Sequence, residues 1–315
     1  MPFGGGGGGA GRVSAVASVG VDVGGTKILG AVVDVTGRVL QERATATEAE
    51  QGVTRVTERI ANVAACLTRW SLDHSRQLLG VGVCVPGYVD GARGVARFGV
   101  NIPWRDCPLA DTLRGRLQHE VHIENDARAG ALGESRFGCG VGVRDFLYVT
   151  VGTGVGCGIV KDGVLLRGGR GAAGDLGHIR IREGLRCRCG RDGCLEAWVA
   201  GPAIVRALNE RRAGCPAVGD ARAVVELGMV GDTDALAVID HAADALVSGL
   251  GVAVALVDPA KIAIGGGLAQ TALWWMRFRS ALKRSGWPSE ITVHRATLGR
   301  WAGVVGAASL ALPRM

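Results

Sequence analysis

VDVGGTKILGAVVDVTG (residues 21–37) decides the fold of this chain, because a similar stretch, VTVGTGVGCGIVKDG (149–163), occurs again in its second half. Each stretch has an apolar β-branched run, a Gly-Thr turn, a second run interrupted by glycine, and a closing turn with Asp and Gly. Repetition of one such unit indicates internal duplication. We therefore expect an α/β protein made of two similar α/β domains that face one another around a cleft.

Periodicity extends this assignment to both halves. In the first half we predict strands over 16–22, 28–35, 38–44, 78–85 and 121–124 and helices over 53–70 and 109–118. In the second half we predict strands over 146–151 and 261–264, with helices over 126–137 and 234–256. The predicted domains are 15–124 and 125–302, with a last helix, 303–312, packing back on the first domain. The Gly-rich residues 1–14 are expected to be a disordered tail.

Composition indicates a globular protein of a reducing compartment. The chain has 315 residues, of which 48% are hydrophobic, and this is enough for two cores. Its nine cysteines are irregularly spaced, which does not suggest a disulfide framework, and we expect a cytoplasmic location. The longest uncharged apolar run, 246–257, is too short to span a bilayer, and no secretory signal is visible.

The charge of the chain is moderately positive, from 36 basic and 29 acidic residues. Almost all of the basic residues are arginines spread along the sequence, so a nucleic-acid-binding face is not expected. Five of them fall between residues 180 and 191, beside a cluster of metal-ligand residues, where their positive charge would offset that of thiolates.

The segment GHIRIREGLRCRCGRDGCLE (177–196) has the ligands of a closed metal site, namely His178, Cys187, Cys189 and Cys194. Three thiolates and an imidazole suit tetrahedral Zn²⁺. The alternative is three unrelated buried thiols, but this polar, Arg-rich segment is unlike a protein core. Asp175 precedes the cluster and Glu196 follows it, so a structural zinc would bring two acids together.

Three Gly-rich turns each follow a predicted strand and are candidates for binding phosphate through backbone N–H groups. Their residues are Asp22, Gly24, Gly25, Thr26 and Lys27 in the first, Gly152, Thr153 and Gly154 in the second, and Gly266 and Gly267 in the third. The chain has no GxxxxGK[ST] motif, which excludes a P-loop. Asp22 either holds Mg²⁺ through water or forms an Asx turn with the N–H groups that follow it.

Asp126, in IENDARAGALGE (123–134), has two interpretations of equal weight. At a helix start it is a cap that favours the helix dipole. Near a domain junction it is instead a general base, taking the proton of an alcohol that attacks a γ-phosphate.

Six motifs in this order, DVGGTK, ENDA, VGTGVG, GxxGDLGHI, CxCGxxGCLE and IAIGGGLA, resemble those of the ROK sugar kinases, which have the actin/hexokinase ATPase fold. The resemblance covers residues 16 to 312. It implies ATP-dependent phosphorylation of a hexose, most often glucose at its 6-hydroxyl, with ATP, Mg²⁺ and structural Zn²⁺. It also implies that Asp126 is the base and that the sugar is held by Asn101, Asn125, Asp175, His178 and Glu196. We expect a homodimer or homotetramer with neither nucleic-acid nor membrane partners.

Three departures from the family pattern fall on the sugar side. Asp175 stands where the family usually has Glu, which draws the carboxylate back by roughly 1.5 Å, and Trp198 and Ala200 also differ from the usual residues. We therefore expect altered substrate choice, and a kinase for another polyol (N-acetylmannosamine, fructose or a sugar-like cyclitol) is the first alternative. A sugar-responsive repressor of the same family is the second, but only a Gly-rich stretch of 21 residues precedes Asp22, which disfavours a DNA-binding domain.

Overall fold

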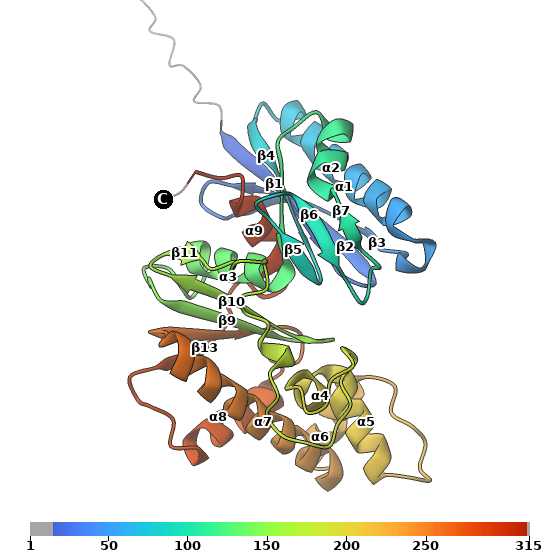
Figure 1. Ribbon diagram of the computed structural model, residues 1–315, viewed down its shortest axis with the longest axis vertical. Coiled ribbons are helices and arrows are strands. Elements are labelled where there is room, and N and C mark those ends of the chain that lie inside the picture. The colour runs from blue at the N-terminus through green and yellow to red at the C-terminus, as the bar shows by residue number, and fades with distance from the viewer. Residues whose placement is uncertain (1–14, 314–315) are drawn as a thin grey trace, which may run out of the picture.

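The computed structural model describes residues 15–313, which form two α/β lobes stacked along the long axis of the molecule (Figure 1). Each lobe is built around one five-stranded mixed sheet. The expected tail, 1–14, lies outside the described residues.

The first sheet has the order β3-β2-β1-β4-β8. Its strands are β1 (Val16–Val23), β2 (Lys27–Asp34), β3 (Val39–Ala46), β4 (Gln77–Val85) and β8 (Val121–Asn125). Strands β1, β2 and β3 are antiparallel neighbours, whereas β4 runs parallel to β1 and β8 runs parallel to β4. All five strands lie within two residues of the predicted ranges.

The second sheet repeats this plan in the order β11-β10-β9-β12-β13. Its strands are β9 (Phe146–Val151), β10 (Val155–Lys161), β11 (Val164–Leu165), β12 (Lys261–Gly265) and β13 (Thr292–Arg295). Strands β9, β10 and β11 are antiparallel, and β12 and β13 continue the sheet in parallel. The two similar stretches of sequence thus form equivalent hairpins, β1–β2 and β9–β10.

Helices cover the outer faces of both sheets, and two further helices lie between the sheets (Figure 1). The outer helices are α1 (Val53–Asp73), α2 (Leu109–Leu117), α4 (Glu196–Val199), α5 (Gly201–Arg211), α6 (Ala221–Met229), α7 (Thr233–Val257) and α8 (Ala272–Arg284). The inner pair is α3 (Asp126–Phe137) and α9 (Ala302–Ser309). Short 3-10 helices are η1 (Ala49–Gln51), η2 (Leu176–His178) and η3 (Gly299–Trp301).

A small antiparallel sheet, absent from the sequence-based prediction, lies beside the first lobe. It consists of β5 (Tyr88–Asp90), β6 (Val95–Phe98) and β7 (Arg105–Cys107). These strands are too short to give a clear alternating pattern. The sheet matters for function because its first strand reaches the space between the lobes.

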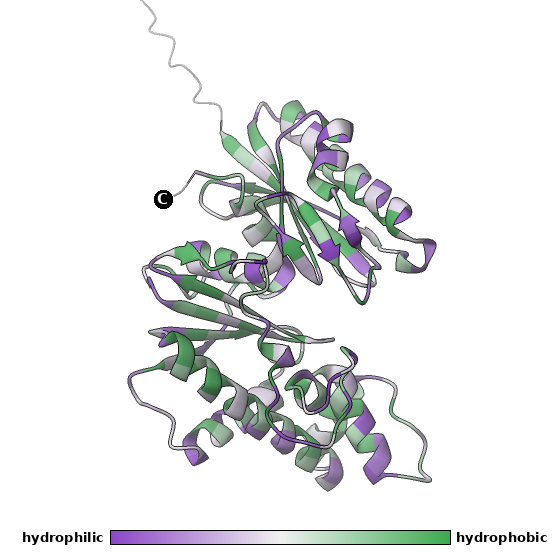
Figure 2. Ribbon diagram, viewed as in Figure 1, coloured by the Kyte–Doolittle hydropathy of each residue, from purple (hydrophilic) through white to green (hydrophobic). Residues whose placement is uncertain are grey.

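Apolar residues concentrate in the strands of the two sheets and in the helices that cover them (Figure 2). Val56, Ile60, Val63 and Leu67 form one stripe of α1, and each is at most 2% exposed. Their spacing of three and four residues places them on one face of the helix. This stripe packs in the same core as β1 and β4.

Helix α9 packs on the first sheet, although it comes from the end of the chain. A Cβ on Gly20 of β1 would lie less than 3.0 Å from backbone atoms of Val304, and one on Gly82 of β4 would meet Ala307 equally closely. Glycine at these two strand positions therefore lets the helix backbone approach the sheet. The helix is shorter than the predicted 303–312 and ends at Ser309.

Among residues 15–313, α7 is the one helix that is long and apolar enough to cross a membrane. Just over half (56%) of its most apolar window is buried within the protein, in the core of the second lobe. A core helix of a globular protein has the same property, so the helix is weak support for a membrane span.

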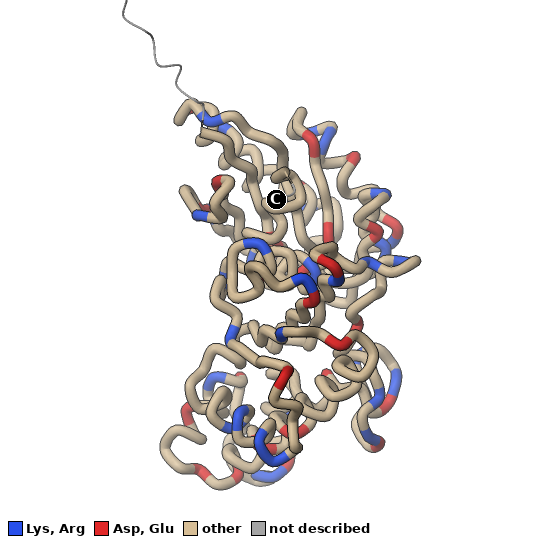
Figure 3. The backbone as a smooth tube through the Cα atoms, turned by 90° about the vertical axis from the view of Figure 1, so that its left-hand side faces the viewer, with Lys and Arg blue, Asp and Glu red and all other residues tan. Residues whose placement is uncertain are grey.

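Acidic and basic residues are interspersed in both lobes (Figure 3). Many of them pair locally, as Arg222 does with Glu226 on α6 and Arg284 with Asp244 between α8 and α7. The excess of arginine is therefore partly neutralised by neighbouring carboxylates.

Candidate functional site

A cavity of about 420 Å³ is lined by all six residues expected to bind the sugar or to act as its base. They come from distant parts of the chain: the β6–β7 connection, the β8–α3 junction, the loop around η2, and the start of α4. These residues are Asn101, Asn125, Asp126, Asp175, His178 and Glu196. The structure thus brings the predicted set together around one cavity.

Asp126 is the first residue of α3, and its carboxylate has one engaged oxygen. Oδ1 accepts hydrogen bonds from the Asn125 side-chain amide (2.7 Å) and from the backbone N–H of Ala127 (2.8 Å). Asn125 is itself the N-cap, because its Oδ1 accepts from the N–H of Arg128 at 3.0 Å. Asn125 therefore caps the helix. The second carboxylate oxygen of Asp126, Oδ2, accepts no hydrogen bond from the described residues.

Burial raises the pKa of Asp126 above the ordinary value of 3.8, and the hydrogen bonds from Ala127 and Asn125 only partly oppose this. A carboxylate that is poorly solvated binds a proton more strongly, which is the property a general base requires.

Asp22, the last residue but one of β1, lies close enough to Asp126 for the two charges to interact. Desolvation, with repulsion from Asp126 as the next cause, raises the pKa of Asp22 to about 6, and a hydrogen bond from Cys84 opposes the rise. The Cys84 thiol donates to Asp22 Oδ1 at 3.3 Å. No hydrogen bond from the following N–H groups to the Asp22 side chain occurs among the described residues, so the Asx turn does not form. Two neighbouring carboxylates suit a divalent cation, which would relieve their repulsion.

The other cavity residues are each held by a neighbour. Asp175 Oδ2 accepts a hydrogen bond from the hydroxyl of Tyr88 at 2.7 Å. Glu196 Oε2 accepts from the N–H of Val155 at 3.0 Å, which ties the start of α4 to β10. Asn101 Oδ1 accepts from Arg188 at 3.2 Å.

The four predicted metal ligands also come together. Their ligand atoms all lie within 4.8 Å of one another, with 3.7 Å between Cys187 Sγ and His178 Nδ1 and 3.6 Å between Cys189 Sγ and Cys194 Sγ. Zinc–sulfur bonds of about 2.3 Å in a tetrahedron place sulfur atoms about 3.8 Å apart, so the donor set fits Zn²⁺. His178 presents Nδ1 to Cys187, and the same residue lines the cavity of about 420 Å³.

Tight turns shape the metal loop, residues 178–194, which carries the four ligands. Gly190 and Gly193 have φ of +89° and +77°, and a Cβ on Gly193 would lie less than 3.0 Å from the carbonyl oxygen of Arg182. Glycine is therefore required where the chain turns back between Cys189 and Cys194.

A second, larger cavity of about 1100 Å³ lies in the second lobe and contains part of the predicted phosphate-binding set. Gly152, Thr153 and Gly267 line it, together with residues of α5 and α6. Gly154 lies next to the smaller cavity, because its Cβ position is 2.6 Å from Oε2 of Glu196, which lines that cavity. Gly266, with φ of +88°, packs on the backbone of Val151 and turns the chain after β12.

The predicted residues of the β1–β2 turn are at neither of these two cavities. Thr47 holds the turn with two hydrogen bonds. Its hydroxyl donates to the carbonyl oxygen of Gly24 at 2.7 Å, and its backbone N–H donates to the carbonyl oxygen of Thr26. Gly25 lies beside Asn101, whose Cβ is 3.5 Å from the Cβ position of the glycine. Gly24, Thr26 and Lys27 are exposed. The turn therefore faces outward, and it adjoins the smaller cavity at Asn101.

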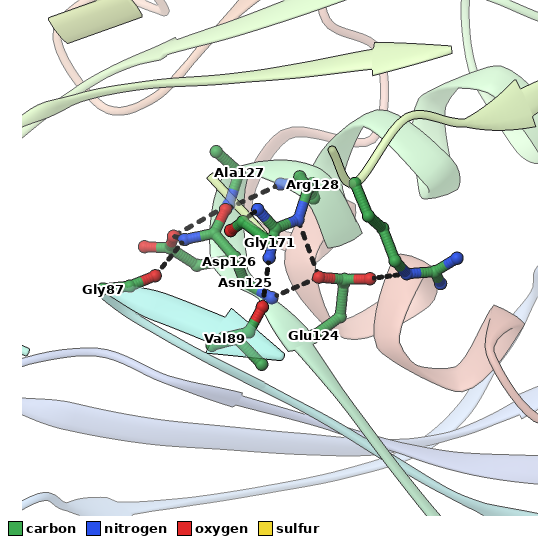
Figure 4. A network of polar contacts seen from close by, with 9 residues as sticks. Gly87, Val89, Glu124, Asn125, Asp126, Ala127, Arg128 and Gly171 are labelled. Atoms are coloured by element: carbon green, nitrogen blue, oxygen red, sulfur yellow. Dashed lines mark hydrogen bonds and ion pairs between the residues drawn. The ribbon is translucent and has the colours of Figure 1, made fainter. Parts of the chain in front are cut away.

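Sequence reasoning missed a buried ionic network behind Asp126 (Figure 4). Glu124 and Arg128, which are 0% and 3% exposed, pair at 2.7 Å, and Arg167 binds the other Glu124 oxygen at 2.6 Å. Arg128 also donates to the carbonyl oxygens of Gly171 (2.6 Å) and Val89 (2.9 Å). The spacing of four between Glu124 and Arg128 was a visible signal, but the partners at Val89 and Gly171 were not.

Sequence reasoning also missed Tyr88, Phe98, Arg188 and Arg191 as cavity residues. Tyr88 and Phe98 belong to the small sheet that was not predicted. The arginines belong to the metal loop, where they had been assigned only a charge-balancing role.

Comparison with known proteins identifies the family of this chain. The ROK family profile matches residues 18–314. A glucokinase of Halalkalibacterium halodurans is 35% identical over 91% of this chain and 92% of its own length, and one of Thermotoga maritima is 33% identical over 94% and 98%. A ROK glucokinase of Streptomyces griseus, solved with glucose and AMPPNP, superposes with a TM-score of 0.83 and 34% identity, covering 93% of this chain and 98% of that one. The chain belongs to the ROK family.

Proposed function

We propose that this protein is an ATP-dependent hexose kinase whose first substrate is glucose, phosphorylated at the 6-hydroxyl. The observation that carries the proposal is the carboxylate of Asp126, which lines the smaller cavity with one oxygen held and the other without a partner among the described residues. The similarity to glucokinases over more than nine-tenths of the chain supports the choice of substrate.

In the proposed reaction the sugar lies in the smaller cavity with its 6-hydroxyl against Asp126 Oδ2. Asp126 takes the hydroxyl proton as the oxygen attacks the γ-phosphorus of ATP, and ADP leaves with the electrons of the broken P–O bond. Asn125 holds Oδ1 and fixes the direction of Oδ2. Asn101, Asp175, His178 and Glu196 bind the remaining sugar hydroxyls.

The larger cavity is the proposed nucleotide site, with the N–H groups around Gly152, Thr153 and Gly267 near the phosphates. Gly154 and Gly266 shape the same region, and the β1–β2 turn, with Gly24, Gly25, Thr26 and Lys27, approaches the phosphates from the first lobe. Asp22 would hold Mg²⁺, which supplies charge neutralisation for the transferred group. Zn²⁺ on the four-ligand loop would be structural, because all four positions are taken by protein.

A substrate screen tests this function directly. Purified protein would be given ATP, Mg²⁺ and one of glucose, mannose, fructose, N-acetylmannosamine or a cyclitol, with ADP release and the phosphorylated position measured. We expect the highest kcat/KM with glucose and phosphate on its 6-oxygen. A clearly better cyclitol or N-acetylmannosamine would make the protein a kinase for another polyol. Sugar binding without ADP release would support a sugar-responsive regulator instead.

The organisation of the molecule is proposed to follow the predicted boundaries, 15–124 and 125–302, with α9 joined to the first domain. A cytoplasmic homodimer or homotetramer completes the proposal, and light scattering of the purified protein would give its oligomeric state.

A further inference from the structure

Tyr88 lies in the sugar cavity opposite Asp175, 87 positions away in the sequence. It is the first residue of β5, in the small sheet, whereas Asp175 precedes η2 at the entrance to the metal loop. The Tyr88 hydroxyl donates to Asp175 Oδ2 at 2.7 Å, and both residues line the cavity. The bond therefore joins two segments that only the tertiary structure brings together.

The backbone on both sides of Tyr88 is fixed from behind. The carbonyl oxygen of Gly87 accepts from Asn125 at 3.1 Å, and that of Val89 accepts from Arg128 at 2.9 Å (Figure 4). Arg128 is buried and paired with Glu124, so it is itself immobilised. The backbone at Tyr88 is consequently held in place, which limits how far its hydroxyl can move away from Asp175.

The segment that carries Asp175 is fixed equally well. Gly171 and Gly174 have φ of +69° and +87°, and a Cβ on either would lie less than 3.0 Å from a backbone oxygen, that of Val89 or Cys157 respectively. Arg128 also holds the Gly171 carbonyl oxygen. The backbone positions of Tyr88 and Asp175 relative to one another are thus set by these surrounding contacts.

This arrangement determines what the wall of the cavity offers to a ligand. Tyr88 uses its single proton on Asp175, which leaves the lone pairs of the phenol oxygen as acceptors. Asp175 Oδ1, which accepts no hydrogen bond from residues 15–313, is a second acceptor. Phe98, whose ring centroid lies 6.4 Å from that of Tyr88, adds an apolar surface beside them. Two adjacent acceptors next to an aromatic ring suit a pair of donating hydroxyls on a neutral polyol.

We propose that Tyr88 is a specificity-determining residue, which orients the Asp175 carboxylate and itself accepts a hydrogen bond from a substrate hydroxyl. The inference rests on the proposed function and adds a residue to its substrate site. It also explains how an Asp serves at position 175: a Glu would push the carboxylate roughly 1.5 Å further, into a hydroxyl only 2.7 Å away.

The first test compares wild type with Tyr88→Phe on glucose and its 2-, 3- and 4-deoxy analogues. Loss of one neutral hydrogen bond changes affinity by roughly three- to tenfold. For one of the three deoxy analogues, we expect the loss of affinity relative to glucose to be larger in wild type than in Tyr88→Phe, by about that factor. The KM for ATP and the zinc content should be the same in both proteins. Equal discrimination by both proteins at all three positions would overturn the proposal.

The second test is a double-mutant cycle with Asp175→Glu. We expect Asp175→Glu alone to lower kcat/KM for glucose by at least about tenfold, and Tyr88→Phe in the same chain to restore much of the loss, because it removes the obstructing oxygen. An equal effect of Asp175→Glu in both backgrounds would contradict the pairing. Repeating the cycle with glucose affinities measured by calorimetry keeps the two proposals distinguishable. If wild type bound glucose without phosphorylating it, the kinase function would fail, while the cycle in binding affinity would still support or contradict the pairing.

Discussion

Gly306 of α9 lies directly against Ala129 of α3. A Cβ on Gly306 would fall less than 3.0 Å from the carbonyl oxygen of Ala129, and a Cβ on Gly133 would lie 2.9 Å from the N atom of Gly306. The two helices between the lobes therefore touch backbone to backbone. Because α9 packs on the first sheet and α3 on the second, this contact joins the cores of the two lobes.

We predict that Gly306→Ala destabilises the protein by about 3 kcal/mol or more, since the added methyl meets backbone that cannot turn aside. Urea unfolding measures the loss. Gly115→Ala is the matched control, because Gly115 is helical and has nothing within 4 Å of its Cβ position. That variant should be unchanged or more stable by up to about 1 kcal/mol. Equal stability of both variants would mean that the α3–α9 contact is looser than described.

Asp126→Asn should lower kcat by at least about 100-fold, because the amide keeps the shape but cannot take the hydroxyl proton. Coupled ADP assays measure kcat, and calorimetry should show that ATP and glucose still bind. In the wild type Asn125 and Ala127 donate to Oδ1 of Asp126, and the amide oxygen of the substituted side chain can accept the same bonds. Turnover within a few-fold of wild type would remove Asp126 as the base.

The raised pKa of Asp126 predicts an acid limb in the pH dependence of kcat/KM for glucose. The base works when deprotonated, so activity falls as pH decreases through its pKa, which desolvation holds above 3.8. The profile should be recorded at saturating ATP, with circular dichroism confirming the fold at each pH. A flat profile down to about pH 4 would be inconsistent with this assignment.

Asp22→Asn should increase stability at neutral pH. Below pH 3.8 this acid is protonated in both states and contributes nothing. As pH rises to about 6 the unfolded chain ionises first, which lowers its free energy and destabilises the native wild type. Above pH 6 the difference in stability between Asp22→Asn and wild type is constant, at most about 3 kcal/mol for a shift of about two pKa units.

Urea unfolding of wild type and Asp22→Asn at pH 4 and pH 7, without added Mg²⁺, measures this difference. The variant should gain much more stability relative to wild type at pH 7 than at pH 4. A gain of the same size at pH 4 would show that ionisation is not its origin.

Cys187→Ala and Cys194→Ala should each lose zinc and raise the KM for the sugar by at least about tenfold, because Asp175, His178 and Glu196 depend on the metal loop. The KM for ATP should change little, since the larger cavity contains none of the metal ligands. Cys215→Ala is the control, as Cys215 is an exposed free thiol. Elemental analysis should give about one zinc per chain in wild type and in this control. Normal sugar affinity in a zinc-free variant would show that the loop does not position the sugar.

Local patterns in the sequence already determined much of this molecule. The two similar stretches gave matching hairpins because alternating β-branched residues and glycine turns act over a few positions. The metal ligands were equally visible, since the four lie within seventeen residues and glycine closes the loop between them. The helix start at Asp126 was also visible, although the capping bond is accepted by Asn125, one residue earlier, from Arg128.

Only the tertiary structure decided which segments meet across the space between the lobes. Tyr88 reaches Asp175 across 87 positions, and Arg128 reaches Val89 and Gly171 across 39 and 43. The residues of α5 and α6 that line the larger cavity carried no motif of their own. Periodicity reports which face of an element is buried, but not what lies opposite that face. The partner depends on how the lobes pack and on the paths of the loops between them, which here include close backbone contacts at single glycines such as Gly306 and Gly171.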